Sequence, residues 1–155
     1  MIRLATKADI PYLQSLLKQV FTVHANGRPD IFKHGTTKYT PNELQDIINS
    51  PDSPIFVYEN EAGVVIGYAF CQYHTIKNNN ILHDLEYIYI DDLCVDERYR
   101  GMHIGKQLFE FVKKTAEEKG CKSIRLNVWK LNESALAFYQ KIGFLPLSYK
   151  MEYNL

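Results

Sequence analysis

The sequence predicts a single mixed α/β domain, on three observations. Its 155 residues, 46% hydrophobic and 23% charged, are enough to bury a globular core. Segments with the period of strands and of helices follow one another in the order β-α-α-β-β-β-α-β-α-β. No repeat, low-complexity tract or linker composition interrupts this order, so one domain over residues 1–155 is expected.

The first half of the chain predicts one strand and two helices. Residues 2–5 form the strand, and Thr6 caps a helix whose apolar side chains recur at helical spacing: Ile10, Leu13, Leu16, Leu17, Val20 and Phe21. Residues 22–39 lack a clear period and are expected to form a long loop. A capping box that begins at Thr40 starts a second helix that ends near Asn49.

The second half predicts five strands and two helices. The strands are expected at 55–58, 64–74, 82–95, 123–129 and 144–153. One helix follows the third of these strands and stops at Gly120, a residue type that commonly ends helices. Asn132 caps the last helix, which ends at Gly143. Residues 87–129 should form a parallel strand–helix–strand crossover, which places a crevice at the strand ends.

Charge and hydropathy argue against two classes of partner. Eighteen basic and eighteen acidic residues give a formal net charge of zero, whereas nucleic-acid-binding proteins usually carry a basic excess. No apolar run approaches membrane-spanning length, and the first residues lack the apolar region of a secretory signal. We therefore expect a cytoplasmic protein with no nucleic-acid or membrane partner.

The three cysteines, Cys71, Cys94 and Cys121, are far apart in the sequence. They form no CxxC pair and no Cys/His cluster at metal-ligand spacing. We interpret them as reduced core thiols, and no metal is expected.

The segment 91–108 carries the first motif of chemical interest. A buried strand runs into a short basic turn with two glycines, which opens an amphipathic helix. Backbone N–H groups from Gly101 to Lys106 and the helix N-terminus would face one spot, as in phosphate sites. The spacing does not fit a P-loop, because Gly101 and Gly105 enclose three residues and Gln107 follows Lys106.

The second motif lies at 132–144 and reads Asn, two residues, Ala, two residues, Phe-Tyr, three residues, Gly-Phe. Together with the order Arg100-x-x-x-x-Gly105, it resembles the GCN5-related N-acetyltransferase (GNAT) family. Ile104 and Gly101 also fit the pattern of that family, but His103 stands where the family has its first glycine. Both motifs occur in the family's order.

The resemblance implies a fold and a cofactor. The fold would be a mixed, mostly antiparallel sheet of six to seven strands, flanked by about four helices, with strands that splay at the cofactor site. The cofactor would be acetyl-CoA, with coenzyme A as product. The residues implied to bind it are Leu93, Cys94, Val95, Arg100, Gly101, Met102, His103, Ile104, Gly105, Lys106, Asn132, Ala135 and Tyr139.

Two catalytic residues follow from the same resemblance. The Tyr139 hydroxyl would protonate the departing thiolate, and Asp91 would accept a proton from the amine, with Asp92 or Glu86 as the alternative base. An amine needs such a base, since an alkylammonium has no lone pair for attack. Consecutive strand residues point to opposite faces, so Asp91 and Asp92 share one cavity only if the strand contains a bulge.

The acceptor is expected to be a primary amine on a small molecule or a peptide. The acidic strand and the loop residues His24 and Arg28 are candidates for its binding site, beside Glu86 and Asp92. Charge at these positions suits a cationic amine, with Arg28 available for a carboxylate. Polyamines, amino acid derivatives, drugs and protein amines all stay open, as does the choice between monomer and homodimer.

The sequence therefore predicts an N-acetyltransferase that works by direct attack in a ternary complex. The alternative is a catalytically silent coenzyme A-binding sensor or interaction module, which only His103 favours.

Overall fold

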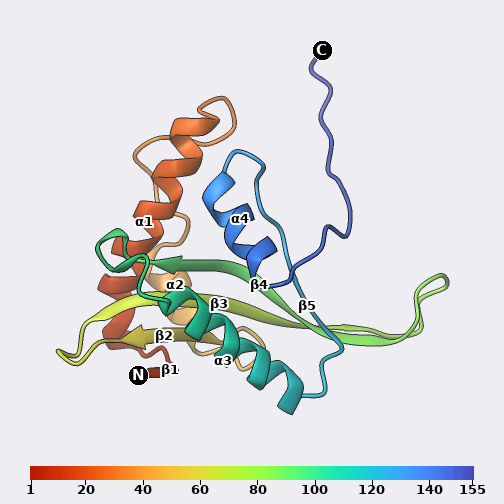
Figure 1. Ribbon diagram of the computed structural model, residues 1–155, viewed down its shortest axis with the longest axis horizontal. Coiled ribbons are helices and arrows are strands. Elements are labelled where there is room, and N and C mark those ends of the chain that lie inside the picture. The colour runs from red at the N-terminus through yellow and green to blue at the C-terminus, as the bar shows by residue number, and fades with distance from the viewer.

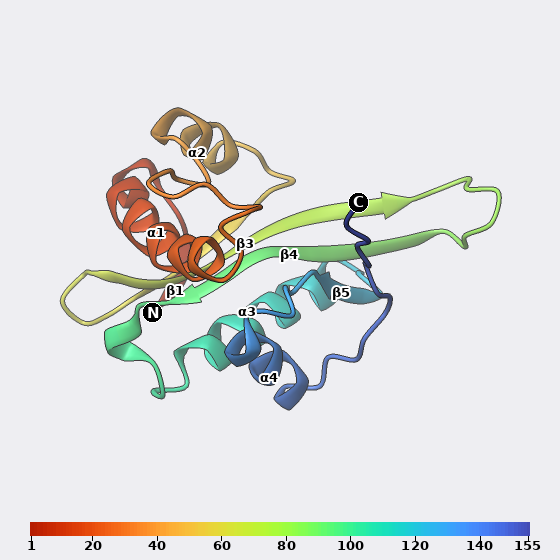
Figure 2. The same ribbon diagram turned by 90° about the horizontal axis from the view of Figure 1, so that it is seen from above.

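The computed structural model describes residues 1–155 and shows one five-stranded sheet between two layers of helices (Figures 1 and 2). The strands lie in sequence order: β1 (Ile2–Leu4), β2 (Ile55–Glu59), β3 (Val65–Ile76), β4 (Leu85–Val95) and β5 (Ser123–Leu126). The helices are α1 (Ile10–Gly27), α2 (Pro41–Ile48), α3 (Ile104–Glu118) and α4 (Glu133–Lys141). Helices α1 and α2 cover one face of the sheet, and α3 and α4 lie on the other (Figure 2).

Each face of the sheet has its own apolar core, because alternate strand residues point to opposite sides. On the α1 face, four leucines of α1 and α2 pack against Val57, Tyr68 and Phe70: Leu13, Leu16, Leu17 and Leu44. On the α3 face, Phe109 and Val112 pack against alternate residues of β2, β3 and β4: Phe56, Ala69, Cys71, Ile88 and Ile90. Every residue of β3 from 65 to 71 is buried, which makes it the central strand.

The sheet is antiparallel from β1 to β4 and parallel between β4 and β5. Helix α3 connects the two parallel strands, so the predicted crossover is confirmed. The mixed α/β class and the four helices also agree with the prediction.

An irregularity in β4 shapes the centre of the molecule. Ile90 pairs with Cys71 and Asp92 pairs with Phe70, so Asp91 is an extra residue in β4 with no partner on β3. The pairing of β4 with β5 ends at Ile90–Leu126, next to this bulge. Beyond it the two strands diverge, as expected, because a bulge bends and twists the strand that contains it.

Three element boundaries differ from the prediction by three residues or more. Helix α1 continues through residues 22–27, because no proline or glycine interrupts it between Phe21 and Gly27. Strand β4 begins at Leu85, after the turn that follows β3. Strand β5 stops at Leu126, since β4 turns away and leaves residues 127–129 without a partner strand.

The expectation of six to seven strands is not confirmed, because the structure has five. The missing element is the strand expected at 144–153. After the bond from the Phe144 N–H to the Tyr139 carbonyl, no backbone group of residues 145–155 has a hydrogen-bond partner in the chain. A strand exists only when a neighbour completes its hydrogen bonds, and this segment has none.

None of the four helices combines the length and the apolar composition needed to cross a membrane.

Candidate active site

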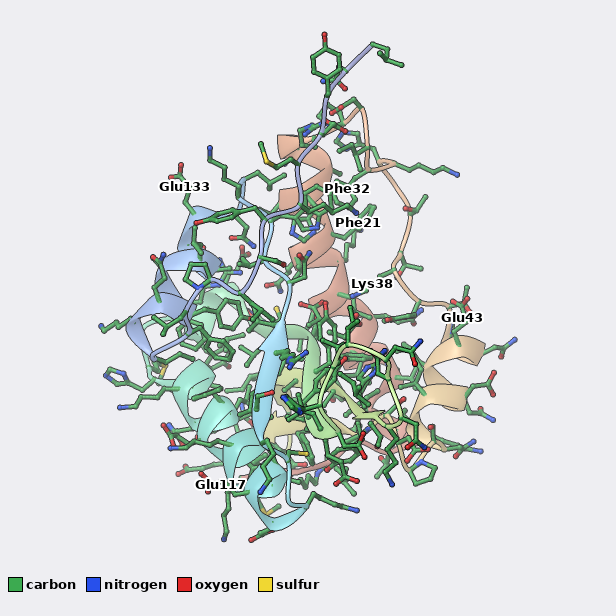
Figure 3. All side chains as sticks on the ribbon, turned by 90° about the vertical axis from the view of Figure 1, so that its right-hand side faces the viewer. Phe21, Phe32, Lys38, Glu43, Glu117 and Glu133 are labelled. Carbon is green, nitrogen blue, oxygen red and sulfur yellow. The ribbon has the colours of Figure 1, made fainter.

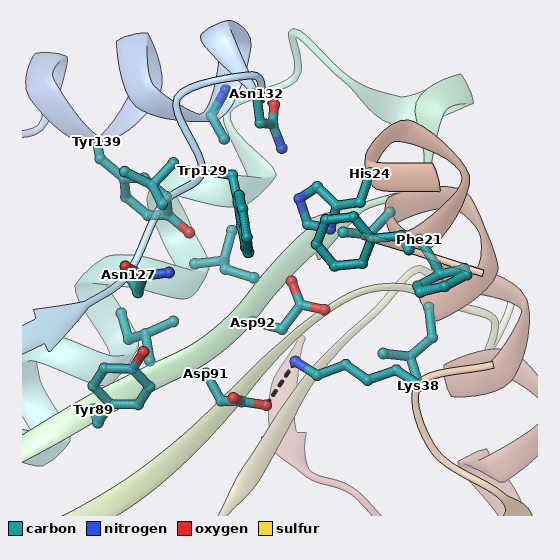
Figure 4. Close-up of a pocket in the computed structure, with 17 residues that line it drawn as sticks. Phe21, His24, Lys38, Tyr89, Asp91, Asp92, Asn127, Trp129, Asn132 and Tyr139 are labelled. Carbon is teal, nitrogen blue, oxygen red and sulfur yellow. Dashed lines mark hydrogen bonds and ion pairs between the residues drawn. The ribbon is translucent and has the colours of Figure 1, made fainter. Parts of the chain in front are cut away.

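The divergence of β4 and β5 opens a pocket of about 290 Å³ at the centre of the molecule (Figure 4). Its walls come from the C-terminal half of α1, the loop before α2, the bulge of β4, residues 127–129 after β5, and α4 with its N-cap. The lining residues include Phe21, His24, Phe32, Lys38, Tyr89, Asp91, Asp92, Leu93, Trp129, Asn132, Ala135 and Tyr139. Most of the catalytic and substrate candidates from the sequence therefore meet in one cavity.

The bulge allows both carboxylates of the acidic pair to line this cavity, which regular alternation would forbid. Their environments differ. Asp91 is already paired, because its Oδ2 accepts hydrogen bonds from Lys38 Nζ at 2.9 Å and from the Tyr39 hydroxyl at 2.8 Å. Asp92 accepts one bond from the Tyr68 hydroxyl at 2.9 Å and points toward the centre of the pocket (Figure 4).

Burial and the two donors near Asp92, Lys38 and Tyr68, act on its pKa in opposite directions, and burial dominates. Removal from water disfavours the ionised form and raises the pKa of Asp92 above its usual value, while Lys38 and the bond from Tyr68 partly offset this. Tyr68 is itself fully buried, and burial raises its pKa, so it stays a donor. Asp92 is therefore a desolvated carboxylate with one fixed donor and an open side toward the pocket.

Tyr139 reaches the pocket from α4, on the wall opposite α1 (Figure 4). It is 8% exposed and its ring contacts Phe138 and Phe144 edge to face. Its hydroxyl has no hydrogen-bond partner within the protein. Burial and the nearby Asp92 charge raise the pKa of Tyr139, which keeps the hydroxyl protonated. The group is thus a proton donor without a protein acceptor.

The turn before α3 presents an unusual row of backbone donors. Six successive N–H groups, from Gly101 to Lys106, have no acceptor within the protein. They precede or open a helix of 15 residues, whose N-terminus carries a partial positive charge. Arg100 and Lys106 add two exposed cationic side chains. This arrangement fits the phosphates of coenzyme A, which need many donors and positive charge.

The conformation of this turn shows how His103 is accommodated where the family has a glycine. Gly101 has φ +80° and His103 has φ +60°, so His103 adopts the left-handed conformation that a glycine would adopt there. Histidine tolerates this region better than most residues, at some conformational cost. Ile104 is buried beneath the turn and anchors it to β3. At Gly105, an added Cβ would lie 3.4 Å from Phe138, so α3 and α4 pack closely at this point.

Four aromatic rings line the end of the pocket next to α1. Phe32 lies 5.1 Å from His24, 5.0 Å from Trp129 and 6.1 Å from Phe21, measured between ring centroids. Burial, with a smaller effect of Lys38, lowers the pKa of His24, so its ring is neutral at physiological pH. This end of the cavity is therefore apolar and aromatic.

Of the remaining candidates from the sequence, Glu86, Arg28 and Cys94 do not line the pocket, whereas Asn132 does. Glu86 is exposed near the far end of β4, and Arg28 binds Asp30 and Glu152 at 2.7 and 3.0 Å. The Cys94 thiol is buried toward α1, where burial raises its pKa to about 12. Asn132 caps α4 through its side-chain oxygen, which accepts from the Ala135 N–H at 3.2 Å.

Sequence reasoning missed several residues of the site, among them Phe21, Phe32, Lys38, Tyr39 and Trp129. Phe21 was assigned to the core, and Phe32, Lys38 and Tyr39 lie in a segment without a period. The only signal was the length of that segment, since long loops in compact domains are often functional. The structure also has no group of three His, Cys, Asp or Glu side chains that could hold a metal ion.

Comparison with protein families gives one match over most of the chain. Residues 17–144 match the family model described as the acetyltransferase (GNAT) family. The matched range contains the acidic pair, the turn before α3 and Tyr139.

Among curated proteins, the thialysine N-epsilon-acetyltransferase of Bos taurus is 30% identical over 116 residues. The match covers 74% of this chain and 61% of that protein, so the chain spans about three fifths of its length.

Two solved structures show how widely the fold is shared. A mutant of the BH1408 protein from Bacillus halodurans has a TM-score of 0.97 and 29% identity, covering 100% of this chain and 99% of that one. The aminoglycoside N-acetyltransferase AAC(6')-Iy, solved in complex with CoA, has a TM-score of 0.74 and 18% identity, covering 100% and 98%. At that identity the second match shows the fold alone.

The left-handed conformation of His103 generates a stability prediction. The His103→Gly variant should raise the free energy of unfolding by about 0.5 to 1 kcal/mol, because relief of the left-handed strain exceeds the added flexibility of the unfolded chain. Urea unfolding followed by circular dichroism measures this change. The control is Met102→Gly, a neighbour without positive φ, which should lower stability. An equal loss of stability in both variants would contradict the prediction that His103 is strained.

Proposed function

This chain belongs to the acetyltransferase (GNAT) family, and we propose that it transfers an acetyl group from acetyl-CoA to a primary amine. One observation carries the proposal. A desolvated carboxylate, Asp92, and a protonated hydroxyl, Tyr139, face one cavity. The row of free N–H groups opens α3, which packs at Gly105 against Phe138 of α4, the helix that carries Tyr139. A proton acceptor, a proton donor and a site for phosphates are the three parts that acetyl transfer from acetyl-CoA needs.

The residues that would hold acetyl-CoA form a continuous path. The N–H groups of residues 101–106, with Arg100 and Lys106, would bind the phosphates. The backbone of Leu93 to Val95, left without a β5 partner, offers donors to the pantetheine arm and the thioester oxygen. Asn132 and the small Ala135 would border the same arm on the α4 side. Acetyl-CoA supplies an acetyl thioester, an electrophile that a neutral amine can attack.

Asp92 is the base that we propose, in place of Asp91. Lys38 and Tyr39 already donate hydrogen bonds to Asp91 Oδ2, so this oxygen is occupied by protein groups. Asp92 has a raised pKa and an open side toward the cavity, so it can accept a proton from a bound amine. Its carboxylate would accept a proton from the bound ammonium, directly or through one water. Glu86 lies too far from the cavity to take part.

Tyr139 would supply the proton that the departing thiolate needs. Its raised pKa ensures that the hydroxyl carries this proton at physiological pH, and no protein group competes for it. The alternative of a silent coenzyme A-binding module rested on His103 alone. That residue adopts the backbone conformation of a glycine and leaves its N–H group free, which removes the argument for lost function.

The acceptor end of the cavity favours a single amine on an aromatic or apolar body. Phe21, His24, Phe32 and Trp129 form an uncharged wall there. Lys38 neutralises Asp91, so Asp92 is the one lining carboxylate without a cationic partner. A polyamine would bring a second ammonium toward Lys38 with no carboxylate to receive it. An aromatic monoamine instead matches both the wall and the single charge.

Tyr139→Phe tests the proton donor. Loss of the hydroxyl should lower kcat about 100-fold while the affinity for acetyl-CoA stays within about twofold, since the ring and its packing are kept. Steady-state rates of thiol release and a titration with coenzyme A give the two numbers. Unchanged kcat between pH 6 and 9 would exclude the assigned role.

Asp92→Asn tests the base and its pH dependence. In the wild type, kcat/KM should fall as the pH drops through the raised pKa of Asp92, because only the ionised carboxylate accepts a proton. The variant should lose about 100-fold in kcat/KM and lack this acidic limb. It should still fold, because the amide oxygen can accept from Tyr68 and no charge is buried. Asp91→Asn is the matched control, and a larger loss there would assign the base to Asp91.

A substrate panel tests the function and the acceptor class together. Thiol release from acetyl-CoA would be followed with 2-phenylethylamine, spermidine, lysine and an aminoglycoside as acceptors. We expect kcat/KM for the arylalkylamine to exceed that for spermidine by at least about tenfold, and Trp129→Ala to reduce the difference. Turnover with spermidine alone would reject the acceptor class but keep acetyl transfer. Coenzyme A binding without turnover on any amine would reject the enzyme.

A further inference from the structure

The last eleven residues have a pattern that their own chain does not use. Apolar or aromatic side chains occupy every second position, and each is at least 77% exposed: Leu145, Leu147, Tyr149, Met151, Tyr153 and Leu155. The positions between them carry small or polar residues: Pro146, Ser148, Lys150, Glu152 and Asn154. A period of two is that of a strand with one face on an apolar surface. The six large apolar side chains on one side of the segment should therefore pack against an apolar surface.

This C-terminal segment, residues 145–155, leaves the body of its own chain. Phe144 is held against Phe109 and Tyr139, with ring centroids 5.4 and 5.5 Å apart. Beyond it the segment is extended, rises past Phe32 and ends away from the rest of the ribbon (Figures 1 and 3). Its one polar side-chain tie to its own chain is Glu152 to Arg28 at 3.0 Å. The segment is thus presented outward with its backbone unpaired.

The sheet offers a matching surface at its β5 edge. Strand β5 pairs only with β4, so its other side has unpaired backbone groups. The two apolar residues of β5, Ile124 and Leu126, are only half-buried although they adjoin the core on the α3 face. A free, partly apolar edge invites a further strand. Phe144 packs in this same core, so the segment begins close to the edge that it does not occupy in its own chain.

We propose that the C-terminal segment is an exchanged strand, which pairs with the β5 edge of a second copy of this chain while that copy returns its own segment. Each chain carries both the strand and the edge, so one two-fold axis satisfies both at once and the assembly closes as a dimer. Pairing would place the six apolar side chains against the partner's sheet, extend that sheet beyond five strands and leave no edge at β5.

The similarity to a solved structure supports a defined extended course of this segment. The last 12 residues make up about 8% of the chain, so a TM-score of 0.97 over its whole length requires that they superpose on the Bacillus halodurans protein. A free tail in water would fold back to shield its apolar side chains or vary in position. A shared outward course indicates instead that the segment is built to be held by something outside its own chain.

Sedimentation of the full chain tests the proposal first. At roughly 50 µM the wild type should sediment with about twice the chain mass of 18.0 kDa. The variant Leu147→Glu with Tyr149→Glu should sediment as a monomer, since two charges would enter the apolar contact. The matched control is Ser148→Glu with Asn154→Glu, which adds the same charge on the other face and should stay dimeric. A monomeric wild type, or an apolar-face variant that stays dimeric, would overturn the proposal.

Hydrogen exchange then separates strand exchange from any other dimer. In the wild type, amides of residues 147–153 and of β5 should exchange at least about tenfold more slowly than in the apolar-face variant, because pairing protects both. Circular dichroism of the variant checks that its fold is kept, which the exposure of the segment leads us to expect. A dimer in which the amides of residues 147–153 exchange freely would overturn the pairing. These readouts do not depend on catalysis, so they stand apart from the test of acetyl transfer.

Discussion

One extra residue in the strand β4 determines how the rest of the molecule can be used. Asp91 has no partner on β3, and at this bulge β4 turns away from β5. The bend turns two consecutive carboxylates into one cavity, leaves residues 93–95 paired with β3 but without a β5 partner, and ends β5 at Leu126. The two cores hold the bulge between them, since the residues on both sides of it, Ile90 and Cys94, are buried. Packing on both faces of the sheet thereby holds the bulge at Asp91 in place.

The same bend gives the neighbouring carboxylates Asp91 and Asp92 different partners. Asp91 faces Lys38 and Tyr39 and becomes part of the wall, whereas Asp92 faces Tyr68 and the cavity and keeps a reactive side. Burial raises the pKa of Asp92, so the fold forgoes some stability to hold a carboxylate there. Such a cost is typical of functional sites. On the opposite wall, burial keeps Tyr139 protonated, and the two groups become a proton acceptor and a proton donor across one space.

Backbone geometry, more than side-chain identity, forms the phosphate site and the edge of the sheet. The turn before α3 leaves six N–H groups free, and His103 supports that turn in a conformation usually left to glycine. The β5 edge and the C-terminal segment are also defined by unpaired backbone groups, and each lacks what the other could supply. The expected sixth strand is therefore absent from one chain although its alternating pattern is present, because a strand needs a neighbour as well as a sequence.

The local elements and the two motifs can be predicted from the amino-acid sequence. Periodicity and caps predicted four helices, the parallel crossover and the turn of residues 100–106, since these depend on neighbours within a few residues. Which of the two carboxylates is free depends on the folded chain, because Lys38 and Tyr39, which bind Asp91, lie more than fifty residues before it. The aromatic wall of the pocket and the absence of a strand at residues 144–153 also depend on tertiary contacts. These features arise from contacts between distant segments. An alternating apolar pattern predicts a strand, but it does not identify the neighbouring strand with which it pairs.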